Sequence, residues 1–193
     1  MQKKSKLVLC GETMHIDMSK RFNQKGTSGI AFKIVQNGKH GGMALSNKLK
    51  KEIQRDFCGE RDYSKIYAIC IYYLINDNLD IFDNLVICND EDPRKVKKHL
   101  DVLFKDKQEY LNKKVISIDE FREVLGNKKI RSYADNISNT YRKKALRPLR
   151  RRQKGIKLNI IKINYKKISL GLKKLKEVEW IFLTIYTHTR WIH

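Results

Sequence analysis

The sequence predicts an α/β fold in which a mixed sheet, made of an antiparallel three-strand meander and parallel strands, is flanked by helices. Short β-forming segments separated by turn residues come first, and apolar runs then alternate with helical patterns. A chain of 193 residues with 41% hydrophobic content suffices for one core. We therefore expect one α/β domain over residues 1–146 and a basic extension over 147–193, packed on or continuous with that domain.

The meander is predicted from segments rich in β-formers. Asn37-Gly38 is a strong hairpin signal before the last of these segments. Asn23, Gly26 and Gly29 are turn-forming residues between the second and third of these segments. The expected strands are Leu7–Cys10, Met14–Met18, Ile30–Val35 and a segment at His40–Leu45.

Helices and further strands are expected in alternation after the meander. Ser46 and Ser64 are placed to cap helices that run to Phe57 and over Lys65–Ile75. The apolar run from Asn84 to Asp90 is typical of a buried parallel strand. The remaining expected elements are a helix from Pro93, a strand at Lys114–Ile118, a helix at Phe121–Leu125 with Asp119 as a possible cap, a helix at Ile130–Leu146 and one or two strands within Ile156–Ile168.

Positive charge is concentrated in the last third of the chain. The formal net charge is +21, and residues 136–193 hold 16 Lys and Arg but only 2 Glu. No carboxylate occurs from Asn136 to Lys176. Such a surface attracts polyanions, so we expect RNA or DNA as the partner. The predicted nucleic-acid-binding residues are Arg142, Lys143, Lys144, Arg147, Arg150, Arg151, Arg152 and Lys154.

Several other classes of protein lack support in the sequence. The longest apolar stretch, Ile66–Ile75, is too short to span a bilayer, and Leu7–Cys10 is too short for a signal peptide, so a cytoplasmic protein without a membrane partner is expected. The four cysteines are widely spaced and are interpreted as small buried hydrophobic residues rather than zinc ligands. Nucleotide-binding loops and serine-hydrolase elbows are absent from the sequence.

Four acidic positions fall where metal-dependent phosphodiester chemistry would use them. Asp17 lies on an expected strand. Because Asp is depleted in strands, its presence there calls for an explanation. Glu52 lies on the next helix, Asp90 or Asp92 follows a strand, and Asp135 lies on a late helix. Hard oxygen ligands favour magnesium or manganese over zinc. The alternative is that these acids are surface carboxylates or caps, and Asp92 is well placed to cap the helix at Pro93.

The segment Met14-His15-Ile16-Asp17-Met18-Ser19 resembles the first strand of the ribonuclease-H-like superfamily, and Tyr133-Ala134-Asp135-Asn136-Ile137-Ser138 resembles its closing helix. The order of elements is also similar, over roughly residues 6–146. The resemblance implies a ribonuclease-H-like α/β domain with a two-metal nuclease site. It implies Asp17 as the ligand shared by two Mg or Mn ions, Asp90 and Asp135 on either side, and Glu52 beside the attacking water.

A non-catalytic protein that binds nucleic acid is the competing interpretation, because it requires only the positive charge. Tyr133, Tyr141 and Tyr165 flank the basic segment and are candidates for stacking on bases, although packing roles suit them equally. A capsid-associated protein whose basic arm neutralises packaged nucleic acid is a third interpretation. Three interpretations of the apolar segment Trp180–His193 remain open, namely a closing strand, a partner-binding segment and a translated region of little structural use.

Overall fold

A computed structural model describes residues 9–56, 62–146 and 161–189, and it is an α/β fold with one five-stranded mixed sheet. The strand order is β3-β2-β1-β4-β5. β1 and β2 pair antiparallel, as do β2 and β3, whereas β1 and β4, and β4 and β5, pair parallel. The strands are β1 (Thr13–Met18), β2 (Ser28–Ile34), β3 (His40–Leu45), β4 (Asn84–Ile87) and β5 (Lys114–Ser117).

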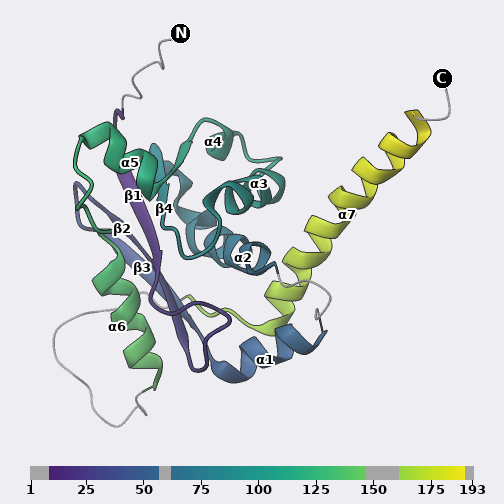
Figure 1. Cartoon of the computed structure of the whole chain (residues 1–193), viewed down its shortest axis with the longest axis horizontal. Helices are drawn as coiled ribbons and strands as arrows, with labels where there is room; N and C mark the ends of the chain where they lie inside the picture. The colour runs from purple at the N-terminus through teal and green to yellow at the C-terminus, as the bar shows by residue number, and fades with distance from the viewer. Residues whose placement is uncertain (1–8, 57–61, 147–160, 190–193) are drawn as a thin grey trace.

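Helices cover both faces of the sheet (Figure 1). One face carries α2, α3 and the start of α7, and the other carries α6 and α5. The helices are α1 (Asn47–Asp56), α2 (Tyr63–Ile75), the 3-10 helix η1 (Asn76–Ile81), α3 (Pro93–Leu103), α4 (Gln108–Leu111), α5 (Ile118–Leu125), α6 (Asp135–Leu146) and α7 (Tyr165–Thr189).

Alternation along β1 divides its side chains between the two faces. Met14, Ile16 and Met18 point into the large core formed with α2 and α3. His15 and Asp17 point to the opposite face, and His15 packs edge-on against Phe121 of α5 with 4.6 Å between ring centroids. The strand is therefore buried on both sides, and its one carboxylate faces α6.

Small residues on β2 and β3 allow α6 to lie directly on the sheet. A Cβ atom at Gly29 would be 2.2 Å from the backbone oxygen of Ser138, and one at Gly42 would be 2.6 Å from the Tyr141 ring. Ser138 and Tyr141 are accordingly buried. Because Asp135 is the first residue of α6, this close packing also determines where that carboxylate lies.

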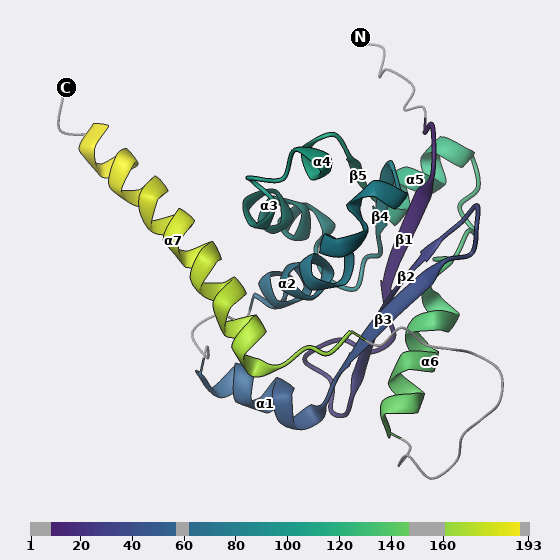
Figure 2. The same ribbon diagram turned by 180° about the vertical axis from the view of Figure 1, so that it is seen from behind.

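The described part of the C-terminal segment joins the main core. The backbone N–H of Ile161 donates to the carbonyl of Gly42 at 3.0 Å. α7 then packs against α2 and α3, with Ile168, Leu172 and Leu175 buried (Figure 2). Strands were predicted within Ile156–Ile168, of which residues 156–160 lie outside the described part of the chain. Residues 161–168 form no strand, because Asn164 accepts the N–H of Lys167 at 3.0 Å and α7 begins at Tyr165.

Other predicted boundaries also need correction. Leu9 and Cys10 are outside any strand, because the positive φ of Gly11 turns the chain before β1. Asp62, rather than Ser64, caps α2 by accepting the N–H of Ser64. Ser117, rather than Asp119, caps α5 in a reciprocal capping box with Glu120. The last helix before the basic segment begins at Asp135 and not at Ile130.

The Gly29→Ala substitution tests the close approach of α6 to the sheet. We expect a loss of about 1–3 kcal/mol in unfolding free energy, because the added methyl group forces α6 away from β2. Denaturant unfolding measures this change. Gly38→Asn is the control, since Gly38 has a φ of +71° with open space around it and Asn tolerates that conformation. Equal effects of the two substitutions would contradict the proposed role of Gly29.

Candidate acidic site

Three carboxylates from separate parts of the chain line one cavity of about 280 Å³. Asp17 comes from the end of β1, Asp90 follows β4, and Asp135 begins α6. β1 and β4 are parallel neighbours, so their carboxyl ends lie side by side and bring Asp17 and Asp90 together. The remaining lining residues are Cys88, Asn89, Ile118, Arg122, Arg131 and Ser132.

Asp17 is the most buried carboxylate of this cavity, with only 8% of its surface exposed. Its Oδ2 accepts a hydrogen bond from the hydroxyl of Ser138 at 3.3 Å, and the thiol of Cys88 also bonds to it. Burial and the nearby charge of Asp90 raise the pKa of Asp17 to about 7. The protonated form is thus favoured by the protein around it.

Asp90, and not Asp92, is the strand-end acid of the cavity. Its Oδ2 accepts the backbone N–H of Met18 at 3.1 Å, and burial raises its pKa. Asp92 instead caps α3, where its Oδ1 accepts the N–H of Arg94 at 3.0 Å. Of the two acids that the sequence left open, Asp90 is the one that lines this cavity.

Asp135 reaches the cavity, but Glu52 does not. Within the described residues, the Asp135 carboxylate has no hydrogen-bond or ion-pair partner. Glu52 lies on α1, where its charge acts on Arg55 and Tyr165, away from the start of α6 (Figure 1). The structure thus brings together three of the four predicted acids.

Two arginines that sequence reasoning did not select also line the cavity. Arg122 of α5 is held by its bonds to the carbonyl of Ile130 at 2.8 Å and to Asp119 at 2.7 Å. Arg131 is exposed, and no described residue bonds to its side chain. These guanidinium groups place positive charge beside the three acids, so the cavity wall is suited to phosphate.

Tyr67 of α2 lies behind the acids and was also missed. It is completely buried, and its hydroxyl has no hydrogen-bond partner among the described residues. Burial and the charges of Asp90, Cys88 and Asp17 raise its pKa well above the ordinary range. A buried hydroxyl normally finds a partner, so this group stands out next to the carboxylates.

The carboxylates of this cavity are of the chemical type that binds a divalent cation, but they are not arranged as a metal site in this structure. Carboxylate oxygens are the ligands that Mg²⁺ and Mn²⁺ prefer. A cation would offset both causes that raise the pKa of Asp17, first its burial and then the charge of Asp90. Across residues 9–56, 62–146 and 161–189, no three His, Cys, Asp or Glu side chains form a ready-made metal site. The residues fit the ion in type, and Asp135 is unrestrained.

The predicted basic surface lies mostly outside the described residues. Arg142 and Lys143 are on α6, beyond Asp135 along the same helix. The backbone of Lys144 continues that helix. The other predicted nucleic-acid-binding residues, Arg147, Arg150, Arg151, Arg152 and Lys154, lie outside the part of the chain that the structure describes.

Fold and cavity together define an α/β protein with an acidic site at the carboxyl ends of β1 and β4. Comparisons with protein-family models, with curated proteins and with solved structures found no match. Among the described helices, none is both long enough and apolar enough to cross a lipid bilayer.

The raised pKa of Asp17 predicts a pH-dependent difference between the wild type and Asp17→Asn. The stabilisation from protonated Asp17 is complete below its ordinary pKa of 3.8 and is lost as the pH rises to about 7. We therefore expect the Asp17→Asn variant to gain stability relative to the wild type across this interval. Burial lowers the pKa of His15 to about 4, so its contribution to stability is lost as the pH falls. This contribution is the same in both proteins and does not affect the difference between them.

Chemical denaturation at a series of pH values, without divalent cations, measures this difference. The control is Asp106→Asn, at an exposed position outside the cavity. If the stability difference between Asp17→Asn and the wild type stays constant from pH 4 to pH 8, the pKa of Asp17 is not raised by its surroundings.

Two tyrosine-to-phenylalanine variants are expected to have opposite effects on stability. Tyr67→Phe removes an unpartnered buried hydroxyl, so we expect a gain of about 1–3 kcal/mol in unfolding free energy. Tyr110→Phe removes a hydroxyl that donates to Asp101 at 3.1 Å, so we expect a loss of about 1–3 kcal/mol. Urea unfolding of both variants tests the pair, and destabilisation by Tyr67→Phe would reveal a hydrogen-bond partner.

Proposed function

We propose that this protein is a metal-dependent nuclease with a ribonuclease-H-like fold. The observation that carries the proposal is the meeting of Asp17, Asp90 and Asp135 in one cavity. The order of elements supports it as well, since an antiparallel β1–β3 meander is followed by parallel β4 and by a late helix that begins with Asp135. Both are what the sequence resemblance implies.

The proposed site divides its work between carboxylates and guanidinium groups. Asp17 and Asp90 are held by Ser138 and by the backbone of Met18, and they would bind Mg²⁺ or Mn²⁺ together with Asp135. When bound, such ions activate water and neutralise the charge that develops on the leaving oxygen. Asp135, whose carboxylate has no partner among the described residues, would supply the third carboxylate to the ions.

Arg122 and Arg131 hold the substrate in this proposal. A phosphodiester approaching three carboxylates is repelled, and the two guanidinium groups in the same wall offset that repulsion. Arg122 is already oriented by Asp119 and the Ile130 carbonyl, so it loses little conformational freedom on binding. The net charge of +21 raises the rate of encounter with RNA or DNA.

The nuclease proposal is tested by cleavage of labelled RNA, DNA and hybrid substrates with Mg²⁺, Mn²⁺ or EDTA. We expect metal-dependent cleavage that falls by about 100-fold or more in the Asp17→Asn, Asp135→Asn double variant, because groups acting in the transition state are lost. Glu52→Gln is the matched control and should cleave like the wild type, since Glu52 lies outside the cavity.

A different outcome favours the alternative function. Salt-sensitive binding of nucleic acid without cleavage under any metal would identify a non-catalytic binding protein, for which the high positive charge is sufficient. Cleavage that survives in the double variant would place the chemistry elsewhere.

A further inference from the structure

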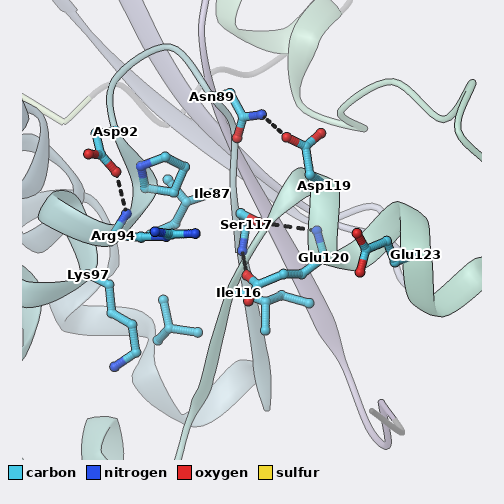
Figure 3. Close-up of a pocket in the computed structure, with 12 residues that line it drawn as sticks. Ile87, Asn89, Asp92, Arg94, Lys97, Ile116, Ser117, Asp119, Glu120 and Glu123 are labelled. Carbon is cyan, nitrogen blue, oxygen red and sulfur yellow. Dashed lines mark hydrogen bonds between the residues drawn. The ribbon is translucent and has the colours of Figure 1, made fainter. Parts of the chain in front are cut away.

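A second cavity lies next to the acidic one. It has a volume of about 440 Å³ and opens at the carboxyl ends of β4 and β5, between α3 and α5 (Figure 3). Asn89 lines both cavities, and its Nδ2 donates to Asp119 at 2.5 Å. Ligands of open α/β sheets bind in crevices at the carboxyl ends of parallel strands, and this volume is typical of small-molecule sites.

The α5 wall of this cavity carries only acidic charges, Asp119 among them, whereas the α3 wall carries two cations beside the helix-capping carboxylate of Asp92. Figure 3 shows Arg94 and Lys97 on the α3 side and Glu120 and Glu123 on the α5 side. Lys97 is paired with Asp101 at 2.9 Å. Among the described residues, Arg94 has no side-chain partner, so one guanidinium group is available on the α3 wall.

The opposite wall also offers one available group. Glu120 is occupied, because its carboxylate accepts the N–H of Ser117 at 2.7 Å in the capping box of α5. No described residue bonds to Glu123, whose carboxylate is exposed. Apolar side chains lie between the two walls, namely Ile87, Pro93, Val115 and Ile116.

We infer that this cavity binds one nucleotide of a single strand, next to the phosphodiester held at Asp17. Arg94 would pair with its phosphate, the apolar residues would contact the base face, and Glu123 would accept a hydrogen bond from an exocyclic amino group. This inference rests on the proposed function, because the acidic cavity beyond Asn89 supplies the neighbouring phosphodiester position.

The same chemistry sets a preference among nucleic acids. A carboxylate accepts from the exocyclic amino groups of adenine, cytosine and guanine, whereas uracil and thymine have no such group and present carbonyl oxygens. The base edge must also be free, and it is free only in a single strand, a loop or an end. The cavity therefore favours an unpaired adenine or cytosine over an unpaired uracil beside the scissile bond.

The test uses the full chain with Asp17→Asn and Asp135→Asn, so that binding is measured without cleavage. Mononucleotides with adenine, cytosine or uracil are titrated and followed by NMR chemical shifts, and single-stranded oligonucleotides are followed by fluorescence anisotropy. Adding Arg94→Ala should weaken binding about tenfold or more, through loss of a charge-assisted hydrogen bond. Lys98→Ala, which removes the same charge from the same helix outside the cavity, is the matched control.

Glu123→Met removes the acceptor from the α5 wall. We expect the preference for adenine and cytosine over uracil, about tenfold, to disappear, because one base-edge hydrogen bond is lost. Glu109→Met, on exposed α4, should keep that preference. Equal binding by the Arg94→Ala and Lys98→Ala proteins, or shifts confined to residues outside the cavity, would overturn the inference.

Failure of this inference is distinguishable from failure of the proposed function. Metal-dependent cleavage by the wild type, with binding and base preference unchanged in both cavity variants, overturns the nucleotide site and leaves the nuclease intact. Nucleotide binding at Arg94 and Glu123 by a protein that cleaves nothing supports the site and rejects the nuclease.

Discussion

The close contact between α6 and the sheet is the constraint on which the acidic cavity depends. Gly29 lets the backbone of α6 approach β2 directly, and Gly42 leaves room for the Tyr141 ring of α6 against β3. Ser138 can then reach Asp17, and Asp135 is placed at the cavity. A larger side chain on β2 would move α6 outward and separate the carboxylates. The geometry of the acidic cavity therefore depends on the glycines of the sheet.

The sheet and its acids were predictable because their signals are local. Segments rich in β-forming residues and the Asn37-Gly38 turn predicted the meander, and the apolar run at Asn84 predicted the parallel strand. Asp17 was conspicuous because carboxylates are rare in strands. Boundaries were less predictable where several residues compete to cap a helix, as Ser117 and Asp119 do before α5.

Other features depended on tertiary packing that the sequence does not encode locally. Glu52 was assigned from the order of elements, but α1 is followed by a second helix, and α2 is the one that packs behind Asp90. α2 is apolar around most of its circumference, so the hydroxyl of Tyr67 gave no periodic signal. Arg122 and Arg131 did not stand out in a chain with so many basic residues, and only their place in the cavity distinguishes them.

The spacing of the three carboxylates along the chain also bears on how the protein is made. Asp17 belongs to β1, Asp90 follows β4, and Asp135 begins α6, which comes after β5 in the chain. Ribosomes deliver these segments one after another, and domains fold as units. A nascent chain that has not yet reached Asp135 therefore carries at most two of the acids, and the cavity forms only after α6 has been made.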